Sequence, residues 1–186
     1  MMRVKVQKIL INIIIIALLV IISYGLSQYL FTSIPVSGVS MENTIQDGDV
    51  LLLYKQGSYQ NGDIVVFNSH KVTDGEERYL VKRIIGMEGD TVEIIQDPSD
   101  GYYYVWLNGV KLVEEYIHPD NIMASEMARI TVPEGMFFYM GDNRGLSVDS
   151  RTTGDLGYVS DIVGRAVLSY VIEDWDFDFL ERWDIA

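Results

Sequence analysis

The sequence predicts a mainly β fold class, with antiparallel sheets forming a barrel-like domain and one N-terminal transmembrane helix before it. Three observations lead to this prediction. Residues 9–31 carry no charge, and the run exceeds the roughly 20 residues that a spanning helix needs. The rest of the chain contains many short apolar runs, which are typical of strands. No long stretch with the 3.6-residue period of an amphipathic helix follows the apolar run.

The apolar run comes first along the chain, and the charges on its two sides predict its orientation. Arg3, Lys5 and Lys8 precede it, whereas no further Lys or Arg appears before Lys55. Basic residues favour the cytoplasmic side of a membrane. We therefore expect the N-terminus in the cytoplasm and the rest of the chain on the outer side.

This orientation divides the chain into a cytoplasmic N-terminus (1–8), a transmembrane anchor (9–31) and one extracytoplasmic domain (32–186). A cleaved signal peptide is the alternative, because Gly25-Leu26-Ser27 resembles a small-residue cleavage site. The uncharged run is longer than the apolar core of such peptides. Its length favours a retained anchor, and with it a single-pass protein of the cell membrane.

The strands of the domain are predicted from short runs rich in Val, Ile, Tyr and Phe that Gly, Asp or Asn bound. Asn108-Gly109 joins two apolar runs, and this dipeptide is the strongest short hairpin signal. The predicted strands are 50–54, 63–67, 80–85, 91–95, 102–107, 136–140 and 163–172.

Composition excludes several functional classes. The formal net charge of -13 disfavours a nucleic-acid partner, because phosphate binding needs a basic surface. Cysteine is absent, which excludes disulfides, thiolate metal sites and a cysteine nucleophile. We expect no cofactor and no metal.

A serine and a lysine are the candidate catalytic residues. Ser40 follows the anchor closely, and nine extended residues reach at most about 30 Å, so it lies near the membrane surface. A serine nucleophile needs a base. His70 and His118, the two histidines, lie in polar loop contexts and are expected on the surface. Lys82 offers the alternative base of a Ser–Lys dyad.

Strand alternation tests whether Lys82 suits this role. A lysine acts as a base near neutral pH only where burial favours the uncharged amine. In an extended segment Leu80, Lys82 and Ile84 share one face and Arg83 points the other way. Aliphatic neighbours favour a buried amine. A surface lysine on an edge strand remains the alternative at this point, as does an ordinary turn role for Ser40.

Three segments resemble those of bacterial type I signal peptidases, in the short, single-anchor form of Gram-positive organisms. Ser37-Gly38-Val39-Ser40-Met41 is similar to the nucleophile box of that family, and Lys82-Arg83-Ile84-Ile85-Gly86 to its general-base box. The block from Gly141 to Arg151 resembles its Gly-Asp-Asn-Arg…Ser-x-Asp-Ser-Arg box very closely. Gly157-Tyr158-Val159 and Ile162-Val163-Gly164-Arg165-Ala166 resemble the closing segment of the family's domain.

The resemblance implies a role for each site residue. Ser40 attacks the scissile carbonyl, and its backbone N–H contributes to the oxyanion hole. Lys82 takes the proton and later serves the leaving amine, while Ser147 orients the lysine. Some relatives carry a serine where Gly38 stands, so that oxyanion donor is absent here or is supplied by backbone or water. The resemblance further implies structural roles around the site for Asp142, Arg144, Asp149 and Arg151.

The resemblance also implies the substrates and partners. These are exported preproteins with small residues at positions −1 and −3 from the cut, together with the lipid bilayer and, as a further candidate, the secretion machinery. Two departures, Asn43 and Glu88, stand where the family often has proline.

Three alternative readings remain. A non-catalytic anchored β-domain that acts as a chaperone of surface-protein or pilus assembly should have lost Ser40 or Lys82. An autoproteolytic Ser–Lys repressor domain should lack both the anchor and the Gly141–Arg151 block. The endoplasmic-reticulum type of signal peptidase uses histidine in place of lysine, so Lys82 argues against it.

Overall fold

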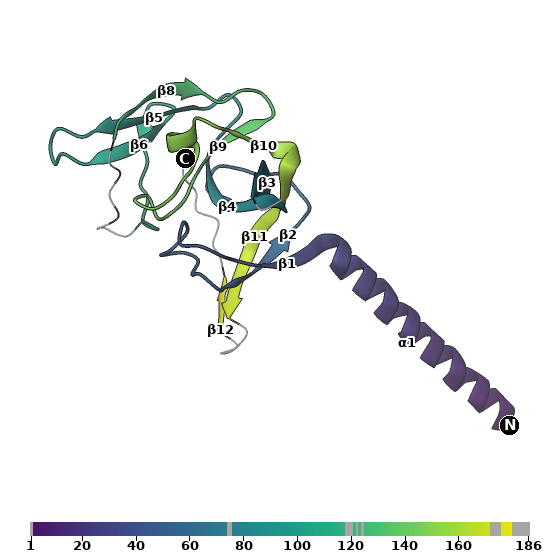
Figure 1. The fold of residues 1–186 in the computed structure, drawn as a ribbon. Helices are drawn as coiled ribbons and strands as arrows, with labels where there is room; N and C mark the ends of the chain where they lie inside the picture. The colour runs from purple at the N-terminus through teal and green to yellow at the C-terminus, as the bar shows by residue number, and fades with distance from the viewer. Residues whose placement is uncertain are drawn as a thin grey trace.

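The chain forms one long apolar helix followed by a β domain of two antiparallel sheets (Figure 1). This computed structural model describes residues 2–73, 76–117, 121, 123, 125–171 and 176–179. The predicted fold class is therefore confirmed: the domain is mainly β, its sheets are antiparallel, and one apolar helix precedes it.

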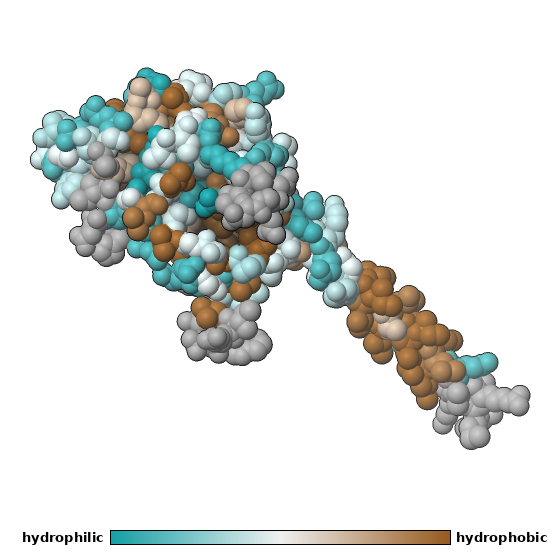
Figure 2. Space-filling view, in the orientation of Figure 1, coloured by the Kyte–Doolittle hydropathy of each residue, from teal (hydrophilic) through white to brown (hydrophobic). Residues whose placement is uncertain are grey.

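Helix α1 spans Met2–Leu30, and its segment Gln7–Leu30 has a mean hydropathy of 2.8. It is long and apolar enough to cross a membrane, and its described side chains lie exposed on all sides. Figure 2 shows it as an apolar rod that projects from a mostly polar domain. The helix ends one residue before the end of the predicted anchor, because Phe31 already pairs with Tyr54 in a sheet.

The first sheet carries Lys82 on β4, and Ser40 lies in the segment that joins its strands β1 and β2. Its strand order is β1-β2-β11-β3-β4-β9-β10, and β12 pairs with β11. The strands are β1 Phe31–Pro35, β2 Val50–Tyr54, β3 Ile64–Thr73, β4 Glu76–Met87, β9 Met136–Met140, β10 Gly157–Tyr158, β11 Ile162–Val171 and β12 Asp176–Phe179.

The second sheet has the order β7-β6-β5-β8 and lies at the end of the domain far from α1 (Figure 1). Its strands are β5 Thr91–Gln96, β6 Tyr103–Leu107, β7 Val110–Lys111 and β8 Met127–Thr131. The predicted hairpin at Asn108-Gly109 joins β6 to β7, with positive φ at both turn residues. Two short helices, α2 Ser150–Thr153 and the 3-10 turn η1 Val159–Asp161, complete the described elements.

Three clusters of buried apolar side chains hold the strands of the domain together. One apolar cluster, which includes Val92, Val105 and Phe138, joins the second sheet to β9. A second cluster, around Leu51, Leu53 and Ile45, lies beneath the turn that carries Ser40. A third surrounds Lys82 and is described with the site. The Ser40 turn and the strand that carries Lys82 therefore pack on two different apolar clusters of the same domain.

Candidate active site

Ser40 lies in a turn that two neighbouring hydrophobic side chains hold in place. Met41 and Ile45 are 1% and 0% exposed and insert into the core, and the Ile45 N–H donates to Met41 O at 2.9 Å. Asn143 holds the turn from the opposite side: its side chain donates to Val39 O at 3.0 Å and its backbone N–H to Ser40 O at 3.1 Å. The turn is therefore fixed to the Gly141–Arg151 block.

The backbone amides of this turn differ in their availability. Within the described residues, the Ser40 N–H has no hydrogen-bond partner, so it is free to bind an incoming oxyanion. The Gly38 N–H is occupied, because it donates to Asp47 Oδ1 at 2.7 Å. Gly38 has φ 109°, a conformation that favours glycine. Its amide therefore shapes the turn and is not an available oxyanion donor.

Lys82 lies on β4 and is only 3% exposed. It pairs with Val65, and the third apolar cluster contains Val65 and Ile84 with Leu80 packed against it. The predicted common face of Leu80, Lys82 and Ile84 agrees with these contacts. Burial lowers the pKa of the Lys82 amine to about 8, and the nearby Asp149 charge opposes part of that fall. A fraction of the amine is then uncharged near neutral pH, which a general base requires.

The Lys82 amine is held by one directed contact. Its Nζ donates to Ser147 Oγ at 3.1 Å. Burial alone would raise the pKa of the Asp149 carboxyl, but hydrogen bonds from Arg151 and Ser147 and the Arg151 charge hold that pKa below its usual range. Ser147 thus donates a hydrogen bond to Asp149, while its oxygen accepts one from the Lys82 amine.

Gly141 brings the two halves of the site together. A Cβ at this position would lie 2.3 Å from both Ser147 Oγ and Ser40 O, so only glycine allows so close an approach. Ser40 and Lys82 line one cleft of about 440 Å³. No hydrogen bond joins their side chains among the described residues. In unliganded enzymes such bonds are often long and tighten on substrate binding.

The cleft is lined mainly by apolar side chains from the strands on its two sides. Its aliphatic lining residues from β1, the Ser40 turn, β3 and β4 include Ile34, Val36, Val39, Val66, Leu80 and Val81. An extended peptide would meet shallow apolar walls beside the serine.

The remaining residues of the Gly141–Arg151 block support the site through buried ion pairs. Asp149 accepts from Arg151 Nε at 2.8 Å and also from the Gly141 N–H at 3.0 Å. Asp149 is in addition the N-cap of α2. Arg144 Nη1 donates to Glu114 at 2.9 Å. These contacts fix the loop that carries Ser147.

Sequence reasoning missed the ion-pair partners of Arg83 and Arg144. Arg83 is fully buried and donates to both carboxylate oxygens of Asp142, from Nε at 2.8 Å and Nη2 at 2.6 Å. Its guanidinium also stacks 3.8 Å from the centre of the Tyr116 ring. An arginine inside an apolar strand was a signal that a buried carboxylate must exist. Nothing in the sequence pointed to Glu114 or Tyr116, and the block that contains Asn143 gave no sign of its contacts with the Ser40 turn.

The two departures from the family pattern have structural counterparts. Asn43 has φ 92°, which proline cannot adopt. The turn after Ser40 therefore takes a form that the usual proline would not allow. Glu88 accepts from the Gly135 N–H at 2.7 Å, so its carboxylate joins two loops.

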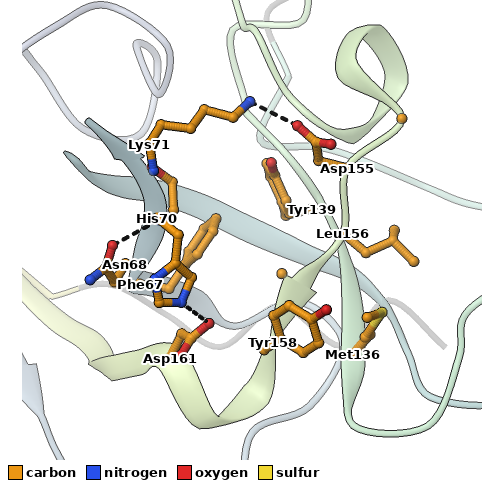
Figure 3. A pocket seen from close by; sticks show the side chains of 13 residues that line it. Phe67, Asn68, His70, Lys71, Met136, Tyr139, Asp155, Leu156, Tyr158 and Asp161 are labelled. Atoms are coloured by element: carbon orange, nitrogen blue, oxygen red, sulfur yellow. Dashed lines mark hydrogen bonds and ion pairs between the residues drawn. The ribbon is translucent and has the colours of Figure 1, made fainter. Parts of the chain in front are cut away.

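His70 does not line the catalytic cleft. His70 lies in a second pocket of about 440 Å³, where its exposed ring contacts Asp161 at 2.7 Å and Lys71 pairs with Asp155 (Figure 3). It is absent from the lining of the Ser40 cleft. His118 lies outside the described residues. The expectation of a surface position is met by His70, whose side chain is 59% exposed.

One prediction separates orientation from chemistry. Ser147→Ala is expected to lower kcat by about one to three orders of magnitude, because the amine loses its fixed direction, and to leave KM almost unchanged. Steady-state kinetics on a cleavable peptide measure both. The matched control is Ser150→Ala, since the Ser150 hydroxyl accepts from the Tyr139 N–H instead. Full activity of Ser147→Ala would remove Ser147 from the site and make Ser150 the next candidate.

A mainly β domain that follows an apolar helix thus brings a serine and a buried amine to one cleft. Comparison with known proteins places the chain in a family. Residues 7–171 match the family described as signal peptidase, peptidase S26, so the chain belongs to that family.

Relatives of this chain are signal peptidases of Gram-positive bacteria. It is 35% identical over 146 residues to signal peptidase I of Bacillus licheniformis, which spans 71% of this chain and 72% of the relative. It is 31% identical over 169 residues to signal peptidase IB of Staphylococcus aureus, with 80% and 82% covered. The crystal structure of a signal peptidase I from Enterococcus faecalis aligns with a TM-score of 0.46 at 30% identity, over 59% of this chain and 97% of that one.

Proposed function

We propose that this protein is a membrane-bound serine endopeptidase that removes N-terminal signal peptides from exported preproteins. The observation that carries the proposal is the buried Lys82 amine, which donates to Ser147 and lines the same cleft as Ser40. Membership of the signal peptidase family and the apolar helix α1 support it.

The proposed mechanism begins with proton transfer. Neutral Lys82 accepts the hydroxyl proton of Ser40 as Oγ attacks the scissile carbonyl, and the free Ser40 N–H stabilises the oxyanion that forms. The lysine ammonium then donates its proton to the leaving amine. A water molecule, activated by the neutral lysine, hydrolyses the acyl-enzyme and restores Ser40.

The shape of the cleft supports a preference for small residues at positions −1 and −3 of the substrate. Branched aliphatic side chains such as Ile34, Val36 and Val81 line it, so a bulky substrate side chain would clash. Replacing alanine at −1 of a model preprotein by tryptophan should therefore abolish cleavage, whereas glycine should be accepted.

The direct test is cleavage of a model preprotein by the purified full-length protein beside its Ser40→Ala variant. Mass spectrometry identifies the cut site. The proposal requires cleavage at the signal-peptide boundary by the wild-type chain only. A folded wild-type protein that cuts none of several preproteins would instead favour the chaperone of surface-protein or pilus assembly.

The proposed location is the outer face of the cell membrane. Arg3, Lys5 and Lys8 lie at the start of α1, before its uncharged segment, whereas acidic residues follow the helix, which supports a cytoplasmic N-terminus. Protease added to intact protoplasts is expected to degrade the domain and to leave an N-terminal tag intact. Complete protection of the domain, with degradation once the membrane is opened, would reverse the orientation.

A further inference from the structure

The junction between the helix and the domain contains no linker. Helix α1 ends at Leu30 and β1 begins at Phe31. Lys55, which directly follows β2, binds the helix end twice: its N–H donates to Leu30 O at 2.8 Å and its Nζ to Gln28 O at 2.7 Å. The last carbonyls of a helix lack partners within the helix and favour a positive charge. Lys55 therefore satisfies them from the sheet.

The first strand continues this attachment without a break. β1 pairs with β2 from Phe31↔Tyr54 to Pro35↔Val50, and the Phe31 and Tyr54 rings lie 5.4 Å apart. Beyond β1, the Val36 N–H still donates to Asp49 O at 2.8 Å. β2 is in turn paired with β11 on its other side, so it is an interior strand. Pairing with β2 and with Asp49 therefore fixes the backbone from the helix end to Val36.

This path leads directly to the nucleophile. Five strand residues advance the chain by about 17 Å, and Ser40 lies four residues beyond Val36 in the turn that Asn143 binds. Both ends of the path are fixed, one at the membrane helix and the other at the catalytic cleft. A flexible tether would let Ser40 move over a range of heights above the bilayer. This fixed connection holds Ser40 at a single height.

We propose that the Lys55-bound junction and β1 act as a spacer that fixes the height of Ser40 above the membrane and so selects where a preprotein is cut. The inference rests on the proposed function. The preferred substrates are membrane-inserted peptides in which a set number of residues separates the end of the apolar segment from the scissile bond. Lys55 is a positioning residue in this account, since it contacts neither the substrate nor the dyad.

The test lengthens the junction and varies the substrate. A Gly-Ser-Gly-Ser insertion between Leu30 and Phe31 adds up to about 13 Å of slack and separates Lys55 from the helix. The matched control carries the same insertion between Asn108 and Gly109, in the hairpin of the distant second sheet. The substrates are vesicle-inserted preproteins that differ only in the spacing between apolar segment and cut, together with one soluble peptide that spans the same cut.

The wild-type protein should show an optimum of spacing. The junction insertion should flatten that optimum or move it to longer spacings, with about a 10-fold loss on the substrate that was best before. Cleavage of the soluble peptide should be unchanged, and the hairpin insertion should resemble the wild type throughout. An unchanged optimum in a junction variant that cuts the soluble peptide normally would overturn the spacer, as would a wild-type protein without any optimum.

A second variant covers the case in which the insertion disturbs folding. Lys55→Met removes the Nζ contact and keeps the backbone N–H, so it should broaden the optimum while leaving the soluble peptide unaffected. A profile identical to wild type in Lys55→Met, with the insertion variant misfolded, would also count against the spacer. Failure of the wild-type protein to cut any of these substrates would instead overturn the proposed function.

Discussion

Replacing either Ser40 or Lys82 by alanine is expected to lower kcat/KM for preprotein cleavage by about four orders of magnitude or more, and the double variant should be no worse than either single one. The two side chains act as one unit, so the loss of one removes the contribution of the other. Single-turnover kinetics with purified variants and a model preprotein measure the effect.

The histidine variants are the matched controls for this experiment. His70 lies in the second pocket beside Asp161, so His70→Ala should retain nearly full activity. His118→Ala should behave in the same way. A histidine variant that loses activity, combined with an active Lys82→Ala variant, would contradict the dyad.

The largest effect on stability is expected from Asp142→Ala. This substitution leaves the guanidinium of Arg83 charged, fully buried and without its carboxylate, and it also removes the acceptor of the Thr44 hydroxyl. Removing one partner of a buried ion pair typically costs about 3–5 kcal/mol. Urea unfolding, followed by tryptophan fluorescence, measures the loss.

Two further variants define the cause of that loss. Arg83→Met combined with Asp142→Leu removes both charges and should recover much of the stability, because apolar side chains then fill the site. Asp155→Ala breaks the exposed pair with Lys71 and should cost at most about 1 kcal/mol. Equal losses for Asp142→Ala and Asp155→Ala would show that the buried pair contributes nothing beyond a surface pair.

Local patterns in the sequence were sufficient for much of the fold. The runs 50–54 and 136–140 coincide with β2 and β9, because both are short, wholly apolar runs that Asp, Lys or Gly bound. β3 and β4 are longer than predicted, since their hairpin extends through polar residues that only cross-strand pairing stabilises. β1 was missed because the apolar run of the helix continues into its first residue, Phe31.

The sequence predicted the surroundings of some site residues but not of others. Alternation along β4 indicated that Lys82 would be buried, and the motif resemblance indicated Ser147 as its partner, which agrees with the contact between them. Pairs such as Arg83 with Asp142 depend on how distant segments pack, which no local pattern encodes. The occupied amide of Gly38 likewise depends on the position of Asp47 across the turn.

The central claim is that burial makes Lys82 a base, and the pH dependence of kcat/KM on a soluble peptide tests it most directly. Only the neutral amine accepts a proton, so activity should rise with pH, with a midpoint near the Lys82 pKa of about 8. Leu80→Asn should rehydrate the amine and move the midpoint toward the value of about 10.4 for a free lysine. Val110→Asn, at an exposed position of β7 in the distant second sheet, is the control and should leave the midpoint in place. A rate that does not change with pH around 8, or a midpoint that Leu80→Asn fails to raise, would contradict the account.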